Sequence, residues 1–272
     1  MTEITGIVYY RAFVGIVLRE VLRFLQQRER FFSALVRPLV WLVVFAAGFR
    51  AVLGIAIQPP YQTYITYDVY IIPGLIAMIQ LFNGMQSSLS MVYDREMGSM
   101  RVLLTTPLPR WFLLTAKLFA GAAVSVIQVY AFLAVSALLG TTFPAWGYVV
   151  ALPVMMLTGL MLGALGMFLS STIKQLENFA GVMNFVIFPT FFLSSALYPL
   201  WRMRESSYIV WQLCTYNPFT YAVEALRFAL YAKIDPLSML IVAAALAAFL
   251  AGAVWGYNPT RGFTARKGGP AE

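Results

Sequence analysis

The chain has 272 residues, of which 61% are hydrophobic and 11% are charged. Soluble domains are about 45–50% apolar and about 25% charged. This composition therefore excludes a soluble globular protein, whose surface would need more charge to stay dissolved. Histidine is absent and Cys214 is the single cysteine. No disulfide can form within the chain, and imidazole is removed from every catalytic, metal-binding or proton-relay scheme.

The net charge of +8 comes from 19 Lys and Arg against 11 Asp and Glu. In a soluble protein this balance would raise the question of nucleic acid. Here the charges fall in short clusters between long uncharged stretches. Such clusters are typical of cationic loops that hold membrane helices against anionic lipid head groups. We therefore expect membrane lipid as a partner, and no nucleic acid.

The amino-terminal segment, residues 1–33, is predicted to form an amphipathic helix at the membrane interface. On a helical wheel Phe13 and Phe24 share an apolar face, and Arg19 and Arg23 lie opposite. A simple lipid anchor fits this pattern, and so does a contact surface for a cytoplasmic partner.

Six membrane-spanning helices are predicted, because about 20 helical residues cross the roughly 30 Å hydrocarbon core. One uncharged run, 118–173, is too long for a single helix, and the turn from Gly140 to Pro144 divides it into two. No Asp or Glu lies within any predicted span. The spans cover residues 34–54, 69–93, 111–138, 147–171, 178–200 and 236–256, within a transmembrane domain over 34–257 that is followed by a tail over 258–272.

An even number of spans places both termini on one side of the membrane. If the termini are cytoplasmic, fourteen Lys and Arg face the cytoplasm and five face outward. The positive-inside rule favours this orientation. Arg37 and Arg50 lie near the two ends of the first predicted span, where long side chains are expected to reach the interface.

The segment after the second predicted span, residues 94–110, carries charges of both signs before a short apolar helix that Pro107 ends. It contains an Arg-Glu-x-Gly motif that begins at Arg95 and a Leu-x-x-Thr-Pro-x-x-Arg motif that begins at Leu103. A short helix between two spans is also compatible with simple packing.

Two further motifs follow, Phe188–Pro199 and Tyr216–Arg227. In the second, Asn217-Pro218 fits a helix cap and first turn, and Glu224 is spaced to pair with Arg227 on the surface of that helix. A cap and a surface ion pair also keep a polar loop folded, whatever passes beneath it.

Together with Ile72-Pro73-Gly74-Leu75, these motifs resemble the membrane subunit of ABC-2-type transporters, the type V ABC exporter fold. The resemblance covers nearly the whole chain. It implies an all-α integral membrane protein with six transmembrane helices and an N-terminal interfacial helix. It further implies a permease dimer on two separate ABC ATPase subunits, which would bind ATP and Mg²⁺, whereas this chain would bind no cofactor or metal.

The same resemblance assigns residues 94–110 to a coupling helix that contacts the ATPase, and residues 201–231 to a re-entrant hairpin at the outer face. The coupling residues would be Asp94, Arg95, Glu96, Gly98, Arg101, Leu104 and Pro107, and the hairpin residues Asn217, Pro218, Glu224 and Arg227.

Polar residues recur along one side of two predicted spans. The second span has Gln80, Asn83 and Ser87, and the fifth has Asn178 and Asn184. Polar side chains in lipid need partners, so these stripes are expected to line a pathway or to form hydrogen bonds at a dimer seam. The spacings Gly159-x-x-x-Gly163 and Gly252-x-x-x-Gly256 predict close helix packing.

We expect an exporter permease of the prokaryotic inner membrane for apolar or amphipathic cargo of the drug or lipid class. A polysaccharide or lipo-oligosaccharide exporter is the alternative. An ion-coupled transporter is disfavoured, because no predicted span contains Asp or Glu. An intramembrane enzyme would need a nucleophile with a base or a metal site, and the single span lysine, Lys117, lies near a helix end. The chain has no Gly-x-x-x-x-Gly-Lys-[Ser/Thr] motif, so energy would come from a partner.

Overall fold

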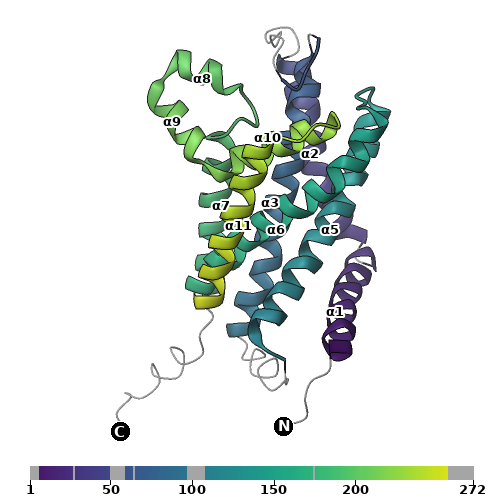
Figure 1. Cartoon of the computed structure of the whole chain (residues 1–272), viewed down its shortest axis with the longest axis vertical. Helices are drawn as coiled ribbons and strands as arrows, with labels where there is room; N and C mark the ends of the chain where they lie inside the picture. Colours follow the sequence, from purple (N-terminus) through teal and green to yellow (C-terminus); the bar gives the residue numbers. More distant parts are fainter. Residues whose placement is uncertain are drawn as a thin grey trace.

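The computed structural model describes residues 6–26, 28–49, 59–63, 65–96, 108–173 and 175–256. The regular structure in these ranges consists of helices joined by short turns (Figure 1). In chain order they are α1 (Gly6–Gln26), α2 (Arg28–Phe49), α3 (Tyr67–Glu96), α5 (Arg110–Leu138), α6 (Ala145–Thr172), α7 (Leu176–Phe192), α8 (Leu200–Ser206), α9 (Tyr208–Tyr216), α10 (Pro218–Leu230) and α11 (Pro236–Gly256).

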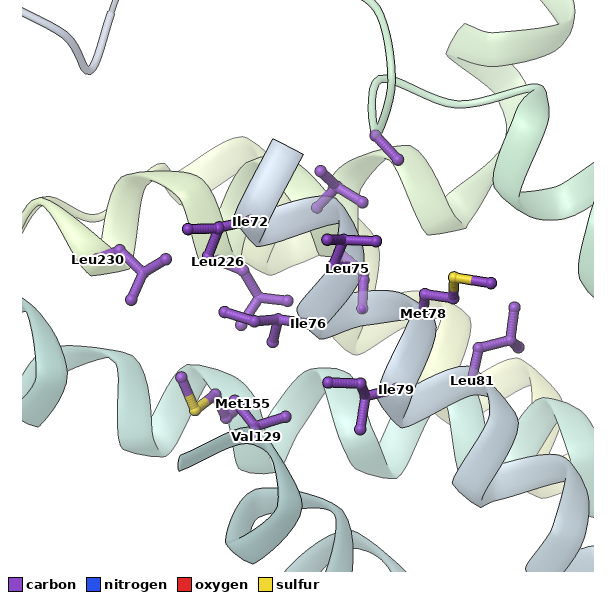
Figure 2. Close-up of a cluster of buried hydrophobic side chains, with 14 of the residues drawn as sticks. Ile72, Leu75, Ile76, Met78, Ile79, Leu81, Val129, Met155, Leu226 and Leu230 are labelled. Carbon is purple, nitrogen blue, oxygen red and sulfur yellow. The ribbon is translucent and has the colours of Figure 1, made fainter. Parts of the chain in front are cut away.

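The central helix of the bundle is α3, which packs against α2, α5, α6, α7 and α10. Its buried side chains belong to one hydrophobic cluster with residues of α5, α6 and α10. Figure 2 shows Ile76 of α3 between Leu226 of α10 and Met155 of α6, with Ile72 beside Leu226. Because apolar side chains cover α3 on so many sides, this helix is shielded from lipid along much of its length.

Helices α3 and α6 approach to backbone contact. A Cβ atom on Gly84 would lie 2.8 Å from the Cα of Gly163, so a side chain has no room there. On α11, a Cβ atom on Gly252 would lie 2.7 Å from the ring of Phe168 in α6. These contacts confirm the close helix packing predicted from the two Gly-x-x-x-Gly spacings.

Among the described residues, four helices, α3, α5, α6 and α11, are long and apolar enough to cross a membrane. The turn between α5 and α6 contains Gly140 with φ +97°, a backbone conformation that glycine adopts without strain. The apolar part of α2 is the shorter range Leu35–Phe45. Helix α7 has 17 residues and ends at Phe192 and not at Leu200, which limits its length to about 26 Å. The count of six spans therefore stays a prediction.

Helix α1 packs against the first turns of α5. The ring centroids of Tyr9 and Phe112 lie 5.1 Å apart, and those of Phe13 and Phe119 lie 5.5 Å apart. The segment predicted as one interfacial helix over residues 1–33 falls on α1, which covers Gly6–Gln26, and on the start of α2 at Arg28; residue 27 lies outside the described residues. A separate face of α1 leaves large apolar side chains exposed, and its place at the membrane interface stays a prediction.

The two ends of the bundle differ in what they carry. Helices α8 and α9 form an arm at one end, which we call the hairpin end (Figure 1). The turn between α5 and α6 lies toward that end, whereas α1 and the last turn of α11 lie toward the opposite end. The first and last described helices therefore reach the same end of the bundle.

Thiol labelling tests which end faces outward. Cys214 is buried, and burial raises the pKa of its thiol, so the natural cysteine reacts slowly and is best replaced by Ala. In Cys214→Ala, the exposed Ser206 and Thr172 lie at the hairpin end and the opposite end, respectively. We expect a membrane-impermeant maleimide to label Ser206→Cys in intact cells and Thr172→Cys only after permeabilisation. The reverse pattern would contradict the predicted orientation.

Candidate functional site

A polar network inside the bundle joins α3 to α6 at Gln80. This side chain is 1% exposed. Its Nε2 donates to the carbonyl oxygen of Met155 at 2.7 Å, and the hydroxyl of Thr158 donates to its Oε1 at 2.8 Å. Both halves of the amide therefore have partners on α6. Such pairing is required in hydrocarbon, where no water is present to replace a missing partner.

The same stripe continues from α3 to α5. The Nδ2 of Asn83 donates to the Oε1 of Gln128, which is itself buried. One turn further, Ser87 lies close to Gly121 of α5. The three residues predicted to line a pathway or a dimer seam thus connect helices of one chain. Gln80 is buried within the chain, whereas Asn83 and Ser87 are half-buried. A pathway or seam role for the three residues stays a prediction.

The polar stripe of α7 has a different environment. Asn178 and Asn184 are both exposed. Asn178 Nδ2 donates to the Oε1 of Gln175 at 2.7 Å, a contact at the start of its own helix. Phe185 and Phe188 are exposed on the same helix. This face of α7 is therefore exposed in the single chain. The predicted pathway or seam role of Asn178 and Asn184 stays a prediction.

At the hairpin end, Asn217 caps α10 and Pro218 opens it, as the sequence predicts. The Oδ1 of Asn217 accepts from the backbone N–H of Phe219 at 3.0 Å. Its Nδ2 donates to two carbonyl oxygens at the end of α7, those of Thr190 at 2.8 Å and Leu193 at 2.6 Å. One side chain therefore begins α10 and satisfies the end of α7, whose carbonyls have no intrahelical partner.

Glu224 and Arg227 form the expected ion pair, but the prediction that it lies on a helix surface is wrong. Arg227 is 2% exposed, because α10 packs against α3, α6 and α11. Its Nη2 donates to the carbonyl oxygen of Ser195 at 3.0 Å, and its guanidinium lies 4.1 Å from the ring centroid of Tyr70. The charge is thus held by a carboxylate, a carbonyl and an aromatic face.

Two tyrosines of α3 that the sequence analysis did not single out complete this contact. The hydroxyl of Tyr70 donates to the carbonyl oxygen of Ser195 at 2.9 Å, and that of Tyr67 donates to the carbonyl oxygen of Leu197 at 3.0 Å. Two tyrosines three residues apart near the start of a predicted span could have indicated this contact, because a buried tyrosine usually needs a hydrogen-bond partner for its hydroxyl.

The predicted coupling residues lie at the other end of α3. Asp94, Arg95 and Glu96 belong to its last turn. The remaining predicted coupling residues, Gly98, Arg101, Leu104 and Pro107, lie outside the described residues. Within the ranges that the structure describes, no group of three or more Cys, Asp and Glu side chains is placed to hold a metal ion.

The bundle has the features of a multipass helical membrane protein, and comparison with known proteins gives its family. Residues 11–231 match the family described as ABC-2 type transporter, so the chain belongs to that family. It is 25% identical over 232 residues to the putative transport permease ycf38 of Cyanophora paradoxa, across 84% of this chain and 77% of the relative.

Two further relatives match shorter stretches of the chain. The putative transport permease ycf38 of Pyropia yezoensis is 26% identical over 231 residues, across 81% of this chain and 74% of the relative. The probable multidrug ABC transporter permease YbhR of Escherichia coli (strain K12) is 31% identical over 153 residues, across 53% of this chain and 39% of the relative.

Replacing Asn217 tests the connection between α7 and α10. Asn217→Ala removes the cap and leaves two carbonyls of α7 without their donor. We expect it to lower the free energy of unfolding by at least about 1 kcal/mol, the usual value of a cap. Thermal unfolding of the purified protein in detergent measures the change. The control is Asn178→Ala, which removes an exposed amide; equal effects of the two would contradict the proposed role of Asn217.

Proposed function

We propose that the chain is the permease subunit of an ATP-driven ABC-2-type exporter. Its cargo would be an apolar or amphipathic molecule of the drug or lipid class, moved out of the cytoplasm or the inner leaflet. The observation that carries the proposal is the family match over residues 11–231. The names of the relatives, transport permease and multidrug ABC transporter permease, support a transport role.

The energy would come from two copies of a separate ABC ATPase subunit, which would hold ATP and Mg²⁺. The contact would be the coupling segment 94–110. Helix α3 supports this assignment, because it is a continuous helix of 30 residues that ends in Asp94-Arg95-Glu96. A displacement of the coupling segment would therefore reach the central helix of the bundle without passing through a flexible linker.

A second copy of the permease would complete the membrane part. Asn178 and Asn184 lie on an exposed face of α7, and amides in hydrocarbon are stabilised when another helix supplies hydrogen-bond partners. A second chain could supply them. We place the assembly in the inner membrane of a prokaryote with cytoplasmic termini, because fourteen of the nineteen Lys and Arg then face the cytoplasm.

Charge removal tests the coupling segment. Glu96→Ala combined with Arg101→Ala should abolish co-purification of the ATPase subunit and the ATP hydrolysis of the complex, because these charges would fix the register of the contact. The matched control is Arg202→Ala with Glu205→Ala, which removes two exposed charges from α8 at the hairpin end. Full ATPase binding by the first pair would contradict the assignment.

Disulfide cross-linking tests the second copy. In Cys214→Ala, the exposed Asn184→Cys should cross-link two permease chains, and the buried Gln80→Cys should not. Dimers are read on a non-reducing gel after oxidation in membranes. Cross-linking at Gln80 with none at Asn184 would mean that α3, and not α7, lies at the seam.

A further inference from the structure

Arg37 places a positive charge at the middle depth of the bundle. Its guanidinium carbon lies 4.0 Å from the ring centroid of Phe82. Phe82 is two residues, about 3 Å, from Gln80, the middle residue of the apolar range Tyr67–Tyr93. Each half of the hydrocarbon core is about 15 Å thick. Arg37 was expected to reach an interface, whereas this contact holds its side chain beside the middle of α3.

No Asp or Glu lies within seven residues of Arg37 in the sequence. The sequence contains no Asp or Glu over 30–67, 69–93 or 178–204, which include most of α2, α3 and α7. Among the described residues, the ion pairs are Arg19 with Glu20 and Arg227 with Glu224. Arg227 shows how this chain buries a structural arginine, and Arg37 lacks that arrangement. An uncompensated charge at mid-membrane is a mark of a functional site.

Arg37 is exposed, and an aromatic contact between α2 and α7 lies on its hairpin-end side. One turn from Arg37, Trp41 of α2 contacts α7, with ring centroids 5.9 Å from Phe191 and 6.1 Å from Phe192. Helices α2 and α7 both pack against α3. Arg37 is exposed, and so is Phe188, which stacks on Phe192 one turn away. Arg37 and Phe188 therefore both lie on the side of this aromatic contact that is farther from the hairpin end.

We propose that Arg37 binds the anionic head group of an amphipathic cargo, whose apolar body lies along the exposed aromatic face of α7. This inference rests on the proposed exporter function and narrows its cargo to molecules with a carboxylate, phosphate or sulfate group. A guanidinium over an aromatic ring keeps its N–H donors at its edge, and their planar geometry matches such oxyanions. A membrane lipid with a phosphate head group shares this chemistry, and the test separates the two sources.

The test uses two photoreactive probes with the same diazirine-bearing octadecyl chain, one a phosphate and the other a trimethylammonium. The assembled permease and ATPase are irradiated with each probe in phosphatidylcholine nanodiscs, and labelled peptides are identified by mass spectrometry. We expect the phosphate probe to label α2 and α7 in preference to the ammonium probe. Equal labelling by both probes would overturn the proposal.

Variants then assign the preference to Arg37. Arg37→Gln should lower phosphate-probe labelling of α2 and α7 by about tenfold or more, as expected for loss of a charge-assisted hydrogen bond. Arg37→Lys should retain part of it and shows that the site still folds. The matched control is Arg204→Gln on α8, whose guanidinium lies 5.2 Å from the ring of Trp211; it should leave labelling unchanged. Unchanged labelling in Arg37→Gln would overturn the proposal.

Labelling with and without trapped nucleotide distinguishes a transported cargo from a resident lipid. Trapping the complex with ATP, Mg²⁺ and vanadate should remove Arg37-dependent labelling, because a transported molecule leaves its site during the cycle. Labelling that depends on Arg37 but is indifferent to trapping would identify a resident lipid and overturn the cargo inference. A chain that binds no ATPase subunit at all would contradict the proposed function, and Arg37-dependent labelling would still be measurable in that case.

Discussion

The seam between α3 and α6 is the contact on which the rest of the bundle depends. The absence of side chains at Gly84 and Gly163 lets the two backbones touch. That close approach brings the amide of Gln80 within hydrogen-bond distance of Met155 and Thr158. In a hydrocarbon environment neither partner has water as an alternative, so the seam is held by polar contacts that cannot be exchanged with solvent. Helices α5 and α10 then pack against this pair.

The same requirement explains the hairpin end, where α7 ends and exposes carbonyl groups. Side chains from two other helices supply the missing donors: Asn217 and Arg227 from α10, and Tyr67 and Tyr70 from α3. The buried charge of Arg227 is compensated there by Glu224. A charged residue is therefore tolerated inside the bundle when a carboxylate lies one turn away, and this contrast makes Arg37 informative.

Local patterns predicted local structure well and long-range contacts poorly. Asn217 and Pro218 carry their own cap and first turn, so a few consecutive residues were enough to predict the start of α10. The burial of Arg227 depends on the carbonyl of Ser195, 32 residues earlier, and no spacing rule contains that contact. The position of Arg37 over Phe82 was not predicted. Helix α2 begins at Arg28, so the arginine lies well inside a helix that was expected to start only three residues before it.

The hydrogen bonds at the α7–α8 turn have an evolutionary consequence. Their acceptors are main-chain carbonyls of Ser195 and Leu197, so a substitution at either residue keeps the acceptor, although the new side chain must still fit a buried position. Substitution of a donor, in contrast, removes the hydrogen bond, and the donors belong to distant parts of the sequence. Within the turn, Ala196 lies directly against Gly74 and leaves no room for a side chain there. The path of this turn is therefore constrained through its backbone, by donors that lie far away in the sequence.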